Sequence, residues 1–145
     1  MAASDTLAIH SDPQDLESLF CWTDGFCVRA GLGSATHLRL KLLLEEVVVN
    51  VMMHGYRDRT DGPIEVRLTH GDDGRIEALV TDEASAFDPL TDGPVPQTDG
   101  DVDARSIGGL GIHFVRTLAS SVEYRSRDGR NVLRMVVDDV QDRSR

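Results

Sequence analysis

The chain has 145 residues, of which 40% are hydrophobic and 28% charged, and its net charge at pH 7 is −10. This length and composition predict a single globular domain over residues 1–145, with its core at about residues 6–138. The acidic balance argues against nucleic-acid binding, and the absence of a signal peptide or a long apolar run argues against a membrane protein, so we expect a cytoplasmic location.

A short strand over residues 6–10 and two helices are predicted in the first part of the chain. Asp12 is a good N-cap and Pro13 suits a first helical turn, so the first helix begins there and ends at a Gly-Leu-Gly sequence. Ser34 is expected to cap the second helix, which Gly55 closes. The two cysteines lie six residues apart in the first helix, about 9 Å along its axis, which predicts reduced thiols rather than a disulfide.

The second predicted helix, residues 35–54, is largely apolar towards its end but carries a polar stripe of Glu46, Asn50 and His54. Residues four apart lie on one helix face, about 40° from each other around the axis. Burying a carboxylate and an amide is costly unless something binds them, and their oxygens are ligands that Mg²⁺ prefers. From these residues alone, a magnesium site and a helix edge facing water are both open interpretations.

Alternating apolar residues predict a half-buried strand over residues 64–68, and an Asp-Asp-Gly turn leads to a returning strand over residues 75–81. A helix over residues 110–119 and a final hairpin, residues 122–126 and 132–137, complete the elements. The order predicts the α+β class: a two-layer sandwich with a mixed, mostly antiparallel sheet and helices on one face.

A long segment over residues 82–109 separates these two parts, and a loop of this length in a compact domain is usually functional or mobile. Asp82 at its start either accepts hydrogen bonds from turn amides or binds an exocyclic amine such as that of adenine. The segment leads into a helix through a glycine-rich string: Gly108, Gly109, Leu110, Gly111 and Ile112. Such glycines let a phosphate approach free helix N–H groups, although a hinge or tight packing explains them equally well.

These signals occur in an order that resembles the N, G1 and G2 boxes of the GHKL ATPase superfamily, which has the Bergerat fold. The short single-domain form is similar to the bacterial anti-sigma-factor serine/threonine kinases of the RsbW type. Residues 46–56 resemble the pattern E-x-x-x-N-x-x-x-H-G/A-Y, and residues 82–90 resemble D-x-G-x-x-F-D-P-L. Residues 131–135 resemble the closing strand, so the resemblance covers about residues 12–137.

The resemblance implies that Glu46 is the general base, that Asn50 contacts Mg²⁺ and that Asp82 binds the adenine amine. Residues 88–108 would form a lid over the nucleotide. Ala84 departs from the pattern, because the family has glycine at this position. The residues expected to bind the nucleotide are Asn50, Asp82, Ala84, Phe87, Gly108, Gly109, Leu110, Gly111 and Ile112.

The function that the resemblance implies is an ATP- and Mg²⁺-dependent serine/threonine protein kinase that acts as an anti-sigma factor in transcription regulation. It would sequester a sigma factor, phosphorylate a small antagonist protein and form a homodimer. Three alternatives stay open: a nucleotide-dependent binding module without transfer, a histidine-kinase-like domain working in trans, and a degenerate interaction scaffold. Ala84 is the main support for the scaffold.

Overall fold

The computed structural model describes residues 3–57, 59–85 and 115–140. Residues 115–118 are helical. The other elements, in chain order, are β1 (Ala3–His10), a 3₁₀ turn (Pro13–Asp15), α1 (Leu16–Ala30), α2 (Ser34–Asn50), a π-helix (Val51–Gly55), β2 (Pro63–His70), β3 (Arg75–Asp82), β4 (Ser121–Arg127) and β5 (Arg130–Asp138).

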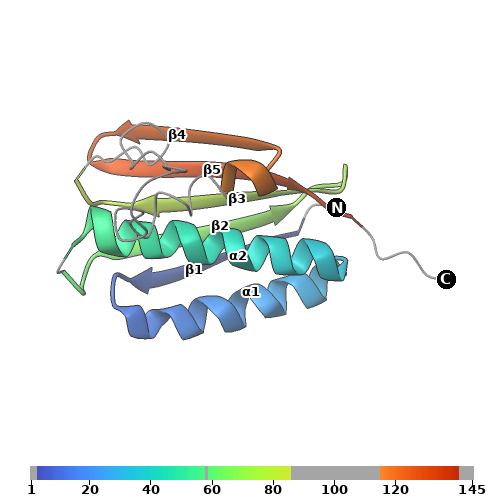
Figure 1. Cartoon of the computed structure of the whole chain (residues 1–145), viewed down its shortest axis with the longest axis horizontal. Helices are drawn as coiled ribbons and strands as arrows, with labels where there is room; N and C mark the ends of the chain where they lie inside the picture. Colours follow the sequence, from blue (N-terminus) through green and yellow to red (C-terminus); the bar gives the residue numbers. More distant parts are fainter. Residues whose placement is uncertain (1–2, 58, 86–114, 141–145) are drawn as a thin grey trace, which may run out of the picture.

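The strands form one sheet in the order β1-β2-β3-β5-β4, and α1 and α2 cover one of its faces (Figure 1). This arrangement confirms the predicted two-layer α+β sandwich, and every pairing between the described strands is antiparallel. The central strand β3 ends at Asp82, one residue later than predicted. There Asp82 pairs with Ile64 on one side and Asn131 on the other, so neighbouring strands flank it on both sides.

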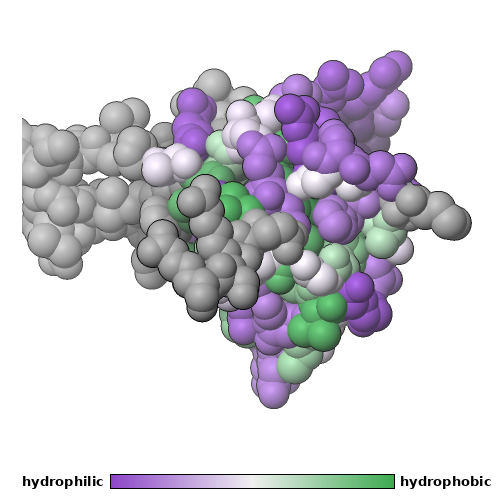
Figure 2. All heavy atoms as spheres, turned by 90° about the vertical axis from the view of Figure 1, so that its right-hand side faces the viewer, coloured by the Kyte–Doolittle hydropathy of each residue, from purple (hydrophilic) through white to green (hydrophobic). Residues whose placement is uncertain are grey.

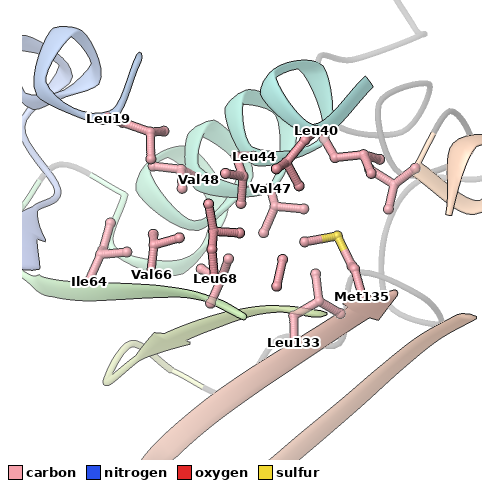
Figure 3. Packing of buried hydrophobic residues seen from close by; sticks show 14 of the residues in the cluster. Leu19, Leu40, Leu44, Val47, Val48, Ile64, Val66, Leu68, Leu133 and Met135 are labelled. Atoms are coloured by element: carbon pink, nitrogen blue, oxygen red, sulfur yellow. The ribbon is translucent and has the colours of Figure 1, made fainter. Parts of the chain in front are cut away.

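The hydrophobic core lies between the two helices and the inner face of the sheet (Figure 3). The predicted alternation of β2 is confirmed, since Ile64, Val66 and Leu68 are buried and the residues between them are exposed. Of the two helices, α2 contributes more residues to this core, including Leu40 and Leu44, which are fully buried. Burying each such side chain stabilises the fold by about 1.5–3 kcal/mol.

The helix caps agree with the predictions in α1 and differ in α2. The Asp12 carboxylate accepts a hydrogen bond from the Gln14 backbone N–H at 3.0 Å, although the first turn is 3₁₀ and α1 begins after it. Gly31 closes α1 in the left-handed conformation, with φ of 67°. The prediction of Ser34 as the cap of the second helix was wrong, because Gly33 occupies the cap position and Ser34 is already helical.

The second helix does not continue as an α-helix to residue 54. It changes to a π-helix after Asn50, and the Tyr56 backbone N–H donates to the Val51 carbonyl oxygen, five residues earlier, at 2.9 Å. The helix ends at Gly55, as predicted, but Gly55 is its last helical residue and not a left-handed cap, and the positive φ of 56° belongs to Arg57. The wider turn brings the helix end close to the residues that follow β3.

Both cysteines are free thiols in α1, as predicted. Cys21 is exposed, whereas Cys27 is buried in the core. Burial raises the pKa of the Cys27 thiol to about 11. Because the thiolate is the reactive form, Cys27 is an inert packing residue at neutral pH.

Hydrophilic residues dominate the end of the molecule that Figure 2 shows, with smaller hydrophobic patches among them. The exposed large hydrophobic residues of the described part are Val28, Leu38, Met53 and Val140. Isolated apolar residues of this kind are ordinary on a protein surface. Within residues 3–57, 59–85 and 115–140, no helix combines the length and apolarity needed to cross a membrane.

Candidate functional site

A pocket lies between the C-terminal end of α2, the π-helix and the adjoining ends of β3, β4 and β5. Its empty space is about 400 Å³, a figure that includes open solvent at the mouth. The pocket brings Asn50 and Asp82, predicted from separate motifs, to one place. Its described lining residues are Val47, Asn50, Val51, Gly55, Val80, Asp82, Ser85, Tyr124, Asn131 and Leu133.

Asn50 is a buried polar residue whose side chain has no hydrogen-bond partner in the described part of the chain. It is 6% exposed, faces the pocket, and makes no hydrogen bond with any described residue through its amide. Its carboxamide oxygen is a suitable ligand for Mg²⁺ or for a water bound to it, so this position fits a metal–phosphate group.

Asp82 is also buried, at 8% exposed, and its two carboxylate oxygens have different surroundings. Oδ1 accepts hydrogen bonds from Asn131 Nδ2 at 2.7 Å and from the Ala84 backbone N–H at 3.0 Å. Oδ2 has no hydrogen bond with a described residue. Burial raises the pKa of Asp82, while the bonds from Asn131 and Ala84 act in the opposite direction. Oδ1 therefore stabilises the turn after β3, whereas Oδ2 can accept a hydrogen bond from a ligand.

Tyr124 and Asn131 also line the pocket, although the sequence motifs predicted a role for neither. The Tyr124 hydroxyl donates to Asn131 Oδ1 at 3.0 Å, and Asn131 Nδ2 donates to the Ala84 carbonyl oxygen at 3.0 Å as well as to Asp82. The alternation along the last strand is the sequence feature that could have identified Asn131. Asn131 occupies an inward position, in line with Leu133 and Met135, where the alternation requires an apolar residue.

Tyr56 ties together the three segments at the base of the pocket. Its hydroxyl donates to the Pro63 carbonyl oxygen at 2.6 Å and accepts from the Glu83 backbone N–H at 2.7 Å. Its side chain is 4% exposed, and burial is the main cause of the raised pKa of its hydroxyl. Tyr56 thereby links the end of the π-helix to the start of β2 and to the residue after Asp82.

Glu46 lies on α2 one turn before Asn50 and is half-buried. It is not among the described residues that line the pocket, and neither is His54, which lies in the π-helix. Burial raises the pKa of the Glu46 carboxyl, and the neighbouring charge of Glu45 raises it further. A carboxylate with a raised pKa is a better proton acceptor near neutral pH, as a general base requires.

Ala84, the departure from the family pattern, packs against a glycine. A Cβ atom added to Gly55 would lie 3.0 Å from the Cβ atom of Ala84. The methyl group of Ala84 therefore occupies space that is free because Gly55 has no side chain. Ala84 is not among the described lining residues of the pocket.

This contact predicts that positions 55 and 84 are energetically coupled. Gly55→Ala is expected to cost at least about 1 kcal/mol more in the wild-type background than in an Ala84→Gly background, because the two methyl groups overpack. Urea unfolding of the wild type, both single variants and the double variant measures this difference. Equal costs in both backgrounds would show that the two positions do not share this space.

The remaining predicted site residues lie outside the described residues. These are Phe87, Gly108, Gly109, Leu110, Gly111 and Ile112, together with the predicted lid over residues 88–108.

The family model described as the histidine kinase-like ATPase domain matches residues 9–137. Among curated relatives, the serine-protein kinase RsbW of Bacillus velezensis is 33% identical over 94 residues, covering 62% of this chain and 58% of that protein. The serine-protein kinase RsbW of Listeria innocua is 27% identical over 132 residues, covering 88% of this chain and 83% of that protein. The chain thus spans less than two thirds of the Bacillus relative.

Among solved structures, the blue-light activated histidine kinase of Erythrobacter litoralis EL346 has a similar fold. It superposes with a TM-score of 0.53 at 19% identity, over 74% of this chain and 31% of that chain. The histidine kinase domain of the same protein gives a TM-score of 0.50 over 71% of this chain and 44% of that chain. At this identity the likeness concerns the fold alone.

Proposed function

The chain belongs to the histidine kinase-like ATPase domain family, and we propose that it is a protein kinase that uses ATP and Mg²⁺ to phosphorylate a serine or threonine hydroxyl of a partner protein. The observation that carries the proposal is the pairing, in one pocket, of a buried Asn50 amide without a described partner and an Asp82 carboxylate with Oδ2 left to accept. The names of the RsbW relatives support the choice of serine as substrate.

In this proposal Asp82 Oδ2 accepts the adenine amine at the inner end of the pocket, and Asn50 holds Mg²⁺ near its mouth. Bound Mg²⁺ neutralises charge on the phosphates, so the protein mainly positions the reactants. Residues 88–108, which lie outside the described residues, are the proposed lid over the nucleotide. The other proposed nucleotide-binding residues are Ala84, Phe87, Gly108, Gly109, Leu110, Gly111 and Ile112.

Glu46 is the proposed general base. The hydroxyl oxygen of the partner forms a bond to the γ-phosphorus, the bond from that phosphorus to the bridging oxygen of ADP breaks, and the hydroxyl proton passes to the Glu46 carboxylate. The position of Glu46 one turn before Asn50 supports this role, because residues four apart share a helix face.

The proposed partners are a sigma factor, which the protein sequesters, and a small antagonist protein, which it phosphorylates. This part rests on the resemblance to the anti-sigma-factor kinases, as do the homodimer and the cytoplasmic location. One observation favours the alternative of a nucleotide-responsive binding module that transfers no phosphate: Glu46 is not among the described lining residues.

Calorimetric titration with ATP, with and without Mg²⁺, tests the nucleotide site. Mg²⁺ is expected to tighten ATP binding by the wild type at least about 10-fold, and Asn50→Ala is expected to remove most of that gain, because the amide oxygen is its proposed ligand. Lys41→Gln serves as the control and is expected to keep the gain, because Lys41 lies on the same helix but pairs with Asp24 at 3.1 Å and is not among the described lining residues of the pocket. No ATP binding at millimolar concentrations, or an undiminished magnesium effect in Asn50→Ala, would contradict the assignment.

A further inference from the structure

A second hollow lies over β3, β5 and β4, and it shares no described lining residue with the candidate nucleotide pocket. On β5, Arg130, Val132 and Arg134 line the hollow, whereas the alternating residues Asn131 and Leu133 line the pocket. Successive side chains of a strand point to opposite faces of the sheet. The hollow therefore lies on the face that α1 and α2 do not cover (Figure 1).

Positive charge gathers in this hollow, although the chain as a whole has a net charge of −10. Its lining includes four arginines and only two acidic residues, Glu123 and Asp128. One arginine is neutralised within the fold, because Arg134 Nε lies 2.6 Å from Glu77 Oε2 and Arg134 Nη1 lies 3.8 Å from Glu123 Oε1. The remaining positive charge belongs to Arg125, Arg127 and Arg130.

These three arginines are poorly neutralised by the described part of the chain. Arg125 and Arg130 make no ion pair or side-chain hydrogen bond with any described residue. Arg127 Nε lies 3.7 Å from Asp128 Oδ2, but both side chains are 90% exposed. An ion pair that is this exposed contributes little to stability, because water screens it. The three guanidinium groups are therefore available to an anionic partner.

The hairpin between β4 and β5 holds the three charges close together. The register places Arg127 directly opposite Arg130, and Arg125 lies on the diagonal of that pair. Asp128 and Gly129 form the tight turn, with φ of 54° and 78°, which fixes this register. Like charges directly opposite each other destabilise a pair of strands. The cluster thus lowers the stability of the free protein, and carboxylates bound to it would remove the repulsion.

Two apolar side chains lie beside the arginines and indicate the kind of partner. Val132, directly opposite Arg125, and Leu79, on the neighbouring strand, are both half-buried and line the hollow. The lining contains no aromatic residue among the described ones on which a nucleic-acid base could stack. Glu123 and Asp128 would also repel a continuous row of phosphates. A protein segment suits the hollow better, since it can offer both carboxylates and an apolar side chain.

We propose that this face is a docking surface for an acidic segment of a partner protein. Carboxylates on either side of an apolar residue of that segment pair with Arg125, Arg127 and Arg130, and the apolar residue packs on Leu79 and Val132. This inference goes beyond the proposed function and does not depend on it, because the hollow and the nucleotide pocket lie on opposite faces of the sheet. Docking is therefore compatible with a bound nucleotide.

A library of random peptides displayed on phage, selected on the wild-type protein, is the probe for this surface. The enriched peptides are expected to carry acidic residues on both sides of an apolar residue. Fluorescence polarisation then gives the dissociation constant of an enriched, labelled peptide. Arg125→Glu and Arg130→Glu should each weaken its binding at least about 10-fold, because the new carboxylate repels the peptide. Raising the ionic strength from about 0.1 M to 1 M should also weaken binding by the wild type.

Arg39→Glu is the matched control, because it makes the same change of charge on α2, in the layer that covers the opposite face. It should keep the wild-type affinity for the peptide. All three variants should bind ATP as the wild type does. Since the peptide test uses no nucleotide, loss of ATP binding by the wild type would contradict the proposed function alone.

The stability of the free protein gives a second readout. Arg130→Glu places a carboxylate opposite Arg127, so it should raise the melting temperature by about 1 to 4 °C while it weakens peptide binding. A lower melting temperature would show that the arginines serve the fold, and would overturn the inference.

Three results of the binding experiments would also overturn it. One is a selection without acidic peptides, or with peptides that bind the Arg125→Glu and Arg130→Glu variants as tightly as the wild type. The second is an oligothymidylate that binds the wild type more tightly than the peptides do, which would assign the face to nucleic acid. The third is self-association of the wild type that Arg130→Glu abolishes, which would assign the face to a second copy of this chain.

Discussion

Replacing Glu46 by glutamine is expected to lower phosphoryl transfer by about 10²- to 10⁴-fold while leaving ATP affinity within about 2-fold of the wild type. The amide has nearly the shape of the carboxylate but cannot take the proton of the attacking hydroxyl. The measurement is the initial rate at which labelled γ-phosphate from ATP appears on the purified partner protein, together with the dissociation constant of ATP from calorimetry.

Glu45→Gln is the matched control, because Glu45 is the adjacent half-buried carboxylate and points about 100° away around α2. It should keep most of the transfer rate. The charge of Glu45 raises the pKa of Glu46, so its removal should lower that pKa and keep the base ionised to a lower pH. The acidic limb of the rate profile should therefore move to lower pH. A Glu46→Gln variant that keeps more than about one tenth of the rate would exclude Glu46 as the base.

Replacing Gly62 by alanine is expected to destabilise the protein by about 3 kcal/mol, at the upper end of what overpacking costs. A Cβ atom at this position would lie 2.4 Å from a ring carbon of Tyr56. The ring cannot easily yield, because its hydroxyl is bonded to both Pro63 and Glu83 and its side chain is buried. The backbone N–H of Gly62 also donates to Ser11 Oγ at 3.0 Å, which restrains the main chain.

Urea unfolding at equilibrium measures this loss, with Gly25→Ala as the control. A Cβ atom on Gly25 would lie 3.1 Å from Arg29 Nη1, the end of an exposed side chain that pairs with Asp5 at 2.8 Å and needs to shift by only a few tenths of an ångström. Gly25 lies inside α1, so alanine there should stabilise the protein by up to about 1 kcal/mol through helix propensity. Gly62→Ala should also weaken ATP binding, because Tyr56 holds the segment after Asp82. Wild-type stability in Gly62→Ala would contradict the fixed position of the Tyr56 ring.

The predictions that held depend on local chemistry. The Asp12 cap, the left-handed Gly31 and the alternation of β2 each involve residues a few positions apart, whose preferences act in the unfolded chain as well as in the native one. The family could be identified for a related reason, since the pattern of residues 46–56 lies within one helical segment and its spacing is visible in the sequence.

The predictions that failed were also local, but tertiary contacts override them. Ser34 has a good capping side chain, yet Gly33 takes the cap position. Gly55 ends the helix as predicted, but it is not a left-handed cap, and the close approach of Ala84 explains its lack of a side chain. The conversion of the helix end to a π-helix accompanies the burial of Tyr56, whose partners come from distant segments.

The sequence by itself determined the two-layer fold, the family and the candidate residues Glu46, Asn50 and Asp82, because periodicity and motif spacing are properties of the chain. The tertiary structure decided that Asn50 and Asp82 line one pocket, and that Tyr124 and Asn131 complete it. Asn131 lies 49 residues from Asp82, and the pairing of β5 with β3 brings them together. Such contacts depend on sheet order and register, which arise from packing the whole chain around one core.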